Sequence, residues 1–313
     1  MENLPAAPRI LIRADLKPLQ GTRFQPTGFP DIGAARYQLA DGTEMLLVES
    51  EQSVANRLET VCWDSASEEL VEPLKGMPYV RVDDGEGRLL TSSLLEAHRL
   101  NSVYIEKSSF YADELVPAIG YDKSRPTDLR ALAKALCRFD PNSLVHGTFL
   151  ESVAGTLRLP RALSGFIEAR DVRVVSSGGV KNDRVTPSTK DTDRSAKDGY
   201  GNVPFHRDEY TADSLTAYFK IDLALLRGLG LGETVEKFLV TLSLWKIRAF
   251  LDEGLRLRTS CDLDVADVEV TRPDGVELAY RSQLEKALAG LIESARSEDV
   301  FGPSPSVAVY TGK

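Results

Sequence analysis

The run LLVESEQSVANRLE, residues 46–59, changes from an apolar strand pattern to a helical pattern within a few residues. Ser50 lies where a helix N-cap belongs, because its hydroxyl can accept a hydrogen bond from a free amide of the first turn. Glu51 follows with a negative charge that the helix dipole favours. An apolar stripe then continues at helical spacing through Val54, Leu58, Val61 and Cys62. We therefore predict a helix at 51–63 that packs this stripe against a sheet.

The other face of this helix carries hydrogen-bonding side chains around a single cation. It consists of Gln52, Ser53, Asn56, Arg57 and Thr60. The first turn of a helix also presents unpaired backbone amides, which suit phosphate oxygens. On spacing alone, this face is either a solvated helix surface or a phosphate-binding surface.

A loop rich in proline and glycine precedes this region and displays two aromatic residues, an arginine and a glutamine. Its sequence is RFQPTGFPDIGA, residues 23–34, which does not suit a helix or a central strand. Together with ESEQS at 49–53 and NR at 56–57, this loop resembles the RAMP-type backbone subunit of the type I-G (earlier I-U) CRISPR Cascade complex. The resemblance continues in order through FDPNSLVHG at 139–147, SSGGVKND at 176–183, YTA at 210–212 and IDLA at 221–224. Several pieces in the right order are more specific than a lone motif.

The resemblance implies a non-catalytic subunit that binds CRISPR RNA (crRNA) and oligomerises along it in a surveillance complex. In such a complex the guide pairs with foreign DNA, and the protein grips the RNA backbone without reading its sequence. The implied partners are crRNA, neighbouring copies of the chain, other Cascade subunits (the crRNA-processing or 5′-handle subunit and the large subunit) and target DNA. No cofactor and no metal site are expected.

Residue chemistry and the resemblance together select the side chains expected at the RNA. Around the helix and the preceding loop they are Arg23, Gln25, Thr27, Gly28, Phe29, Ser50, Gln52, Ser53, Asn56 and Arg57. Phe29 can stack on a base, which is a sequence-tolerant contact. His146, in the FDPNSLVHG motif, is a core or helix-contact histidine by its sequence surroundings, whereas the resemblance places it close to bound RNA.

Residues 176–206 contain almost no large apolar side chains and are rich in Gly, Ser, Thr, Asp, Lys and Arg. Such a long stretch is either a surface excursion or a functional segment. In the subunits that the chain resembles, the corresponding insertion is the thumb, a projecting hairpin that reaches the neighbouring subunit and pins the guide RNA. Its cations expected at the RNA are Lys181, Arg184, Lys190, Arg194 and Arg207.

Length and composition are those of a folded cytoplasmic protein. The chain has 313 residues, of which 42% are hydrophobic, and we expect neither a secretory signal nor a membrane span. Cys62, Cys137 and Cys261 are far apart in apolar surroundings, which predicts reduced core thiols rather than a disulfide framework or a zinc site. The formal net charge of -9 opposes nucleic-acid binding unless the cations gather on one surface.

The remaining periodicity predicts an α+β fold. Strands are expected at 9–16, 35–39, 44–48, 166–175, 214–224 and 263–270, with an Asp41-Gly42 hairpin turn between the second and the third. Further helices are expected at 92–100, from 128, from 140, at 233–251 and at 281–294. The main elements then run βαββαβ, the ferredoxin-like order of RNA-recognition (RRM-like) domains, which the resemblance favours more than the periodicity does. The predicted single RAMP-type domain has a palm at 9–63, 164–176 and 208–296, an inserted finger region at 64–163 and a thumb at 176–207.

Two other functions stay open, although the chain has no hydrolase triad motif, phosphate loop, HExxH or paired-cysteine cluster. One is a RAMP endoribonuclease, because type III relatives of the subunits that this chain resembles cut target RNA with an aspartate on the thumb-side loop. The candidates here are Asp183, Asp191, Asp193 and Asp198. The other is an ordinary small-molecule α/β enzyme, which would purify as a discrete monomer or dimer without nucleic acid.

Overall fold

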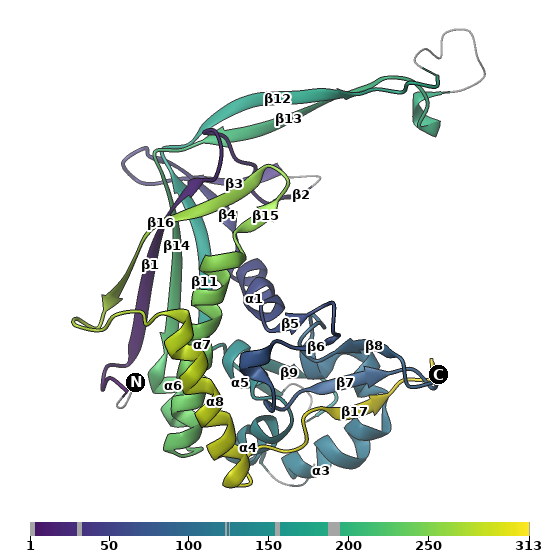
Figure 1. Cartoon of the computed structure of the whole chain (residues 1–313), viewed down its shortest axis with the longest axis vertical. Helices are drawn as coiled ribbons and strands as arrows, with labels where there is room; N and C mark the ends of the chain where they lie inside the picture. The colour runs from purple at the N-terminus through teal and green to yellow at the C-terminus, as the bar shows by residue number, and fades with distance from the viewer. Residues whose placement is uncertain are drawn as a thin grey trace.

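A curled antiparallel sheet organises the molecule (Figure 1). The computed structural model describes residues 4–29, 33–122, 124, 126–153, 157–186 and 195–312. Within these residues the strand order of the largest sheet is β15-β16-β1-β14-β11-β4-β3-β2. The strands are β1 (Arg9–Pro18), β2 (Gly28–Phe29), β3 (Gly33–Gln38), β4 (Glu44–Glu49), β11 (Leu163–Arg170), β14 (Ser214–Asp222), β15 (Arg256–Arg258) and β16 (Cys261–Arg272).

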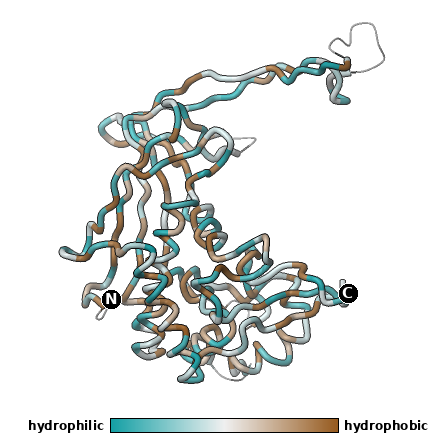
Figure 2. Tube along the Cα trace, viewed as in Figure 1, coloured by the Kyte–Doolittle hydropathy of each residue, from teal (hydrophilic) through white to brown (hydrophobic). Residues whose placement is uncertain are grey.

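Strand β1 shows why the sheet buries one face. Ile10, Ile12, Ala14 and Leu16 are buried, whereas Arg13 and Asp15 between them are only half-buried. The alternation of apolar and polar residues is the period of two that a half-buried strand needs. Figure 2 shows it as alternating colour along the trace. Because β1 pairs with both β14 and β16, it lies inside the sheet.

Helices α1 (Glu51–Thr60) and α7 (Glu233–Glu253) cover the buried face of the sheet, and α8 (Arg281–Ser297) packs against α7 (Figure 1). The short α6 (Leu223–Gly228) precedes α7. Helix α7 supplies the largest core side chains, since Phe238, Trp245 and Phe250 are fully buried. It ends at Gly254, whose amide donates to the Phe250 carbonyl at 2.7 Å.

A side lobe, residues 63–160 with the C-terminal residues 300–312, projects from the sheet beyond α1 (Figure 1). Its strands are β5 (Trp63–Asp64), β6 (Glu69–Leu70), β7 (Val80–Asp83), β8 (Leu89–Ser92), β9 (Thr148–Leu150), β10 (Leu157–Leu159) and β17 (Ser306–Val309). Its helical elements are Glu72–Leu74, Arg99–Asn101, α2 (Val103–Glu106), Tyr111–Leu115, α3 (Val116–Ile119), α4 (Leu129–Phe139) and α5 (Asn142–His146). The C-terminal β17 pairs in parallel with β7, a contact that the sequence pattern did not predict.

A long hairpin projects from the opposite end of the sheet (Figure 1). It consists of β12 (Arg173–Lys181) and β13 (Val203–Thr211), with a short helical turn at Ala196–Asp198 near its tip. The two strands pair in unbroken register from Arg173 opposite Thr211 to Lys181 opposite Val203. Gly178 is required here, because a Cβ at this position would lie 2.3 Å from the Phe205 carbonyl oxygen. The predicted polar segment at 176–206 is therefore a projecting β-hairpin in its described part.

Strands β1, β3, β4, β14 and β16 and helices α1, α4, α7 and α8 confirm the corresponding predictions, whereas two other predicted elements are wrong. No helix forms at 92–100; the segment is a series of turns ending in Arg99–Asn101, because the hydroxyls of Thr91 and Ser102 both bond the Glu96 carboxylate and hold the chain in turns. The strand expected at 166–175 is two strands, β11 and β12. They are separated at Asp171, which has a φ of 51°, so the chain leaves the sheet there and enters the hairpin.

Among the described residues, no helix is long and apolar enough to cross a membrane. The three cysteines are buried and form no disulfide. Burial raises the pKa of the Cys137 thiol to about 12. Burial is also the main reason why the pKa of the Cys261 thiol rises to about 11. Both thiols are therefore protonated at neutral pH, which agrees with the predicted core role.

Candidate functional site

The start of α1 is built on a buried carboxylate. Ser50 caps the helix as predicted, since the Ser53 amide donates to its Oγ at 3.3 Å. Glu49, which has no exposed surface, accepts hydrogen bonds from the Ser53 hydroxyl and from Arg57 Nη2, the latter at 3.2 Å. A second guanidinium, that of Arg258 on β15, also pairs with Glu49. Two arginines thus share one buried carboxylate beside the first turn of α1.

Arg258 ties the loop at 23–29 to this cluster. Its Nη1 donates to the Gln25 carbonyl at 2.7 Å and its Nη2 to Thr27 Oγ1 at 2.8 Å. The Arg57 guanidinium bonds across to the Leu257 carbonyl at 2.7 Å. The predicted residues Gln25, Thr27, Ser53 and Arg57 are thus brought together, but Arg57 is held by an ion pair and a carbonyl rather than projecting freely.

A second ion-pair cluster lies at the base of the hairpin. The buried Glu209 pairs with Arg23 at 3.0 Å and with Arg207 at 2.6 Å, and Arg207 also donates to Ser260 Oγ at 2.7 Å. Burial alone raises the pKa of Glu209, but the Ser177 hydroxyl and the two arginines together lower it below its usual value. The predicted Arg23 and Arg207 therefore hold the hairpin to the sheet.

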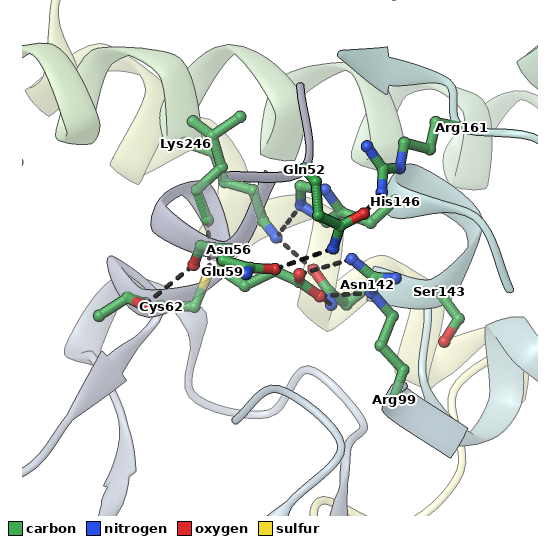
Figure 3. A network of polar contacts seen from close by, with 12 residues as sticks. Gln52, Asn56, Glu59, Cys62, Arg99, Asn142, Ser143, His146, Arg161 and Lys246 are labelled. Atoms are coloured by element: carbon green, nitrogen blue, oxygen red, sulfur yellow. Dashed lines mark hydrogen bonds and ion pairs between the residues drawn. The ribbon is translucent and has the colours of Figure 1, made fainter. Parts of the chain in front are cut away.

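The other predicted residues lie at three places. Lys181 and Arg184 are exposed on the hairpin, and Gly28 and Phe29 form β2 at the edge of the sheet. Gln52, Asn56 and His146 lie close to a groove on the side-lobe flank of α1 (Figure 3). Lys190 and Arg194, with Asp191 and Asp193, fall outside the residues that the structure describes.

This groove, which we call the arginine groove, has a volume of about 840 Å³. It runs between the start of α1, the turn at 97–101 and the β9–β10 hairpin. Its lining residues are Gln52, Ala97, His98, Arg99, Asn101, His146, Gly147, Thr148, Phe149, Arg158, Leu159, Pro160 and Arg161. This lining contains three arginines and no carboxylate, although the whole chain carries a net charge of -9. The cations that a polyanion needs are thus concentrated here.

Two arginines stand at the mouth of the groove. Arg161 donates to the Glu51 carbonyl at 3.2 Å and to the Gln52 side chain, so it lies against the first turn of α1. Gln52 in turn donates to Asn56 Oδ1 at 3.3 Å. The exposed Arg158 lies over the Phe149 ring, 4.9 Å from its centroid, an arrangement that leaves planar groups available for stacking.

A buried polar network forms the floor of the groove (Figure 3). Arg99 and Glu59 make a bidentate ion pair with both contacts at 2.6 Å, and Asn142 Nδ2 donates to Glu59 Oε1 at 2.8 Å. Lys246 bonds Asn142 Oδ1 and His146 Nε2, the latter at 2.9 Å. The network joins α1, the 99–101 turn, α5 and α7, and therefore locks the side lobe to the helices of the sheet.

Sequence reasoning missed five charged residues of these sites: Arg99, Arg158, Arg161, Lys246 and Arg258. One signal was available for Lys246, because it interrupts the apolar run of α7 directly after Trp245. A lysine in the buried part of a helix needs a polar partner. The arginines carry no comparable local signal, since their partners are far away in the sequence.

The fold and this site define an α+β protein with a projecting hairpin and an arginine-lined groove beside a helix start. Residues 10–174, more than half of the 313 residues, match the family model described as CRISPR-associated protein GSU0053 (Cas_GSU0053). The chain belongs to this CRISPR-associated family, as the predicted resemblance implied. No curated protein matches the sequence.

Solved structures show more distant similarity. A chain of a CRISPR RNA-guided surveillance complex described as pre-nicking is 13% identical with a TM-score of 0.44, and the match covers 93% of this chain and 89% of that chain. A second CRISPR RNA-guided surveillance complex gives 13% identity, a TM-score of 0.37 and coverage of 93% and 84%. Csc2 of Thermofilum pendens gives 10% identity, a TM-score of 0.33 and coverage of 91% and 76%.

Proposed function

We propose that the chain is a non-catalytic, crRNA-binding backbone subunit of a type I-G CRISPR surveillance complex. The observation that carries the proposal is the arginine groove, where Arg158 and Arg161 face a lining without a carboxylate, while the third arginine, Arg99, is paired with Glu59 beneath it. Single-stranded nucleic acid binds where cations neutralise phosphates and planar groups accept stacked bases. Membership of a CRISPR-associated family makes guide RNA the ligand that fits this chemistry best.

In this proposal Arg161 and Gln52 bind phosphates beside the first turn of α1, whose free amides favour anions. Arg158 and Phe149 offer a stacking surface at the other side of the groove. The exposed Lys181 lies on the hairpin at the opposite end of the sheet, where it would bind the RNA strand farther along its length. Every one of these contacts is to backbone or to the face of a base, so guide sequence is left to pairing with target DNA.

Oligomerisation and the palm belong to the same proposal. The strands β16, β1, β14 and β11 lie side by side in that order, and each neighbouring pair is antiparallel. Along the chain, α1 lies between β1 and β11, and α7 lies between β14 and β16. This order supports the proposal of a ferredoxin-like palm, in which the side lobe would be the inserted finger region. The hairpin projects far from the sheet and would reach a neighbouring copy, while crRNA, target DNA and the other Cascade subunits complete the assembly.

The described aspartates of the thumb make structural hydrogen bonds, which favours RNA binding over RNA cleavage as the function. Asp183 accepts hydrogen bonds from the amides of Val185, Thr186 and Gly201 at 2.9–3.0 Å, and Asp198 accepts one from the Ser195 hydroxyl at 2.6 Å. These carboxylates organise turns of the hairpin tip, which is the usual task of aspartate in such loops. We therefore infer no catalytic role for Asp183 or Asp198.

The test is co-expression of the chain with a matching repeat-spacer transcript and the partner subunits, followed by extraction and sequencing of the bound RNA. The expected result is guide-length RNA in a large particle. The double variant Arg158→Gln/Arg161→Gln should lose most of this RNA. Arg9→Gln/Arg36→Gln should keep it, because this variant removes two exposed arginines of the sheet with the same charge change. Nucleic-acid-free protein of fixed small size would instead favour the small-molecule enzyme.

A further inference from the structure

One lysine is buried completely in α7, and no carboxylate of the described residues forms an ion pair with it. Lys246 has no exposed surface, and its ammonium bonds Asn142 Oδ1 and His146 Nε2. Asn142 must present its oxygen to the lysine, because its Nδ2 already donates to Glu59. An ammonium group can only donate, so His146 Nε2 is an acceptor.

This contact assigns the tautomer of His146. A neutral imidazole carries one proton, and when Nε2 accepts, that proton lies on Nδ1. The ring is neutral because burial first, and then the charges of Lys246, Arg99 and Arg161, lower its pKa well below the usual value. These three cations face the ring from α7, from the 99–101 turn and from the segment after β10. Of the buried carboxylates that interact with these charges, Glu59 is engaged by Arg99 and Asp140 accepts from the Ser143 hydroxyl.

The Nδ1–H group of His146 has no hydrogen-bond partner among the described residues, and neither has Thr148 Oγ1. Both side chains are buried, with 1% and 7% of their surface exposed. Both residues line the arginine groove, on either side of Gly147. Buried polar groups are almost always paired, so two unpaired ones at the same groove indicate a ligand atom.

We propose that His146 Nδ1–H and the Thr148 hydroxyl form a donor pair for an oxygen of the RNA sugar–phosphate backbone, and that Lys246 is the positioning residue that fixes the histidine tautomer. The acceptor is a ribose 2′-hydroxyl or a phosphate oxygen. A neutral histidine differs from the arginines of the groove in one respect, since it donates a hydrogen bond without carrying a charge. The inference rests on the proposed RNA-binding function and adds how this part of the groove recognises its ligand.

The first test needs no RNA. In the full chain labelled with ¹⁵N at its three histidines, the imidazole shifts should show the Nδ1–H tautomer for His146, unchanged between pH 5.5 and 8, with the exposed His98 and His206 as internal comparison. In Lys246→Met the Nε2–H tautomer should appear, because no ammonium group then requires Nε2 as an acceptor. An Nε2–H tautomer or a titrating His146 in the wild-type chain would overturn the assignment even if RNA binds.

The second test measures RNA affinity of the wild-type chain and of Thr148→Val, which removes the hydroxyl and keeps the shape. Affinity for a guide-length RNA should fall about fivefold to tenfold, the effect of one hydrogen bond, whereas Thr271→Val on β16 should not change it. The same comparison is then made with a 2′-deoxy version of the strand. If Thr148→Val no longer weakens binding, the acceptor is the ribose hydroxyl; if it still weakens binding, the acceptor is a phosphate oxygen. No effect on either strand refutes the donor pair. A chain that binds neither strand instead refutes the proposed function, while the tautomer stays testable.

Discussion

Replacing Glu59 by glutamine should destabilise the fold strongly, because it leaves a guanidinium buried without its counter-charge. Arg99 is only 7% exposed and makes both of its short contacts to Glu59. Removing one partner of a buried ion pair typically costs about 3–5 kcal/mol, since the remaining charge stays desolvated. Glutamine can keep the bond from Asn142 and one bond from Arg99, so we expect the lower end of that range, about 3 kcal/mol.

The assay is urea unfolding of Glu59→Gln, followed by intrinsic fluorescence, with two comparison variants. Glu269→Gln removes a carboxylate that pairs with Arg13 on the open face of the sheet, where the two side chains are 47% and 42% exposed, and should cost less than about 1 kcal/mol. Glu59→Gln/Arg99→Met removes both charges and should recover part of the loss. If Glu59→Gln costs no more than Glu269→Gln, the network is not the lock between side lobe and sheet that we describe.

Three further predictions test other parts of the account. Arg161→Gln should weaken binding to all guide sequences about equally and reduce the slope of log affinity against log salt by about 0.7, the value for one lost phosphate contact on a single strand; a sequence-selective loss would count against a phosphate contact. Gly178→Ala should disrupt the β12–β13 hairpin, because the new Cβ would lie 2.3 Å from the Phe205 carbonyl oxygen, whereas Gly228→Ala meets nothing within 4 Å; hydrogen exchange of the hairpin amides separates the two, and equal protection in both variants would refute the steric argument. Asp140→Asn should remove a pH dependence of stability, because burial raises the folded-state pKa of Asp140 from 3.8 to about 6. The folded state therefore binds this proton more tightly than the unfolded state does. The contribution of Asp140 to the free energy of unfolding is complete below pH 4, and about 3 kcal/mol is lost as the pH rises to 6. The free energies of unfolding of the wild type and of Asp140→Asn, measured at pH 4 and pH 6.5, check this. The same difference between the two proteins at both pH values would contradict the prediction.

The parts of the fold that sequence predicted well depend on local signals. The Ser50 cap, the Asp41-Gly42 turn and the alternation along β1 are each encoded within a few neighbouring residues. The prediction for 92–100 was wrong for the opposite reason. Its apolar spacing suits a helix, but hydrogen bonds from Thr91 and Ser102 to Glu96 hold the segment in turns, and Ser92 and Ser93 are buried. The apolar spacing shows neither these side-chain bonds nor this burial of polar residues.

The site was predicted less completely, because its geometry depends on pairs that are far apart in the sequence. Arg57 was expected to face a phosphate, yet it pairs with Glu49, and that carboxylate also holds Arg258, 209 residues away. Gln52 was predicted at the helix start, and there it lines the groove; its RNA contact stays a prediction. Arg161 was missed, since only the folded chain brings it against the first turn of α1.

The most direct test of the account is ultraviolet crosslinking of the chain to crRNA in the assembled complex, followed by mass spectrometry of the crosslinked peptides. We predict crosslinks at Phe149 and in neighbouring residues of the arginine groove, with further ones on the β12–β13 hairpin. Phe166 on β11 and Tyr218 on β14 form an aromatic pair whose ring centroids are 5.2 Å apart. Crosslinks confined to these two residues would place the RNA on the sheet instead and contradict the account.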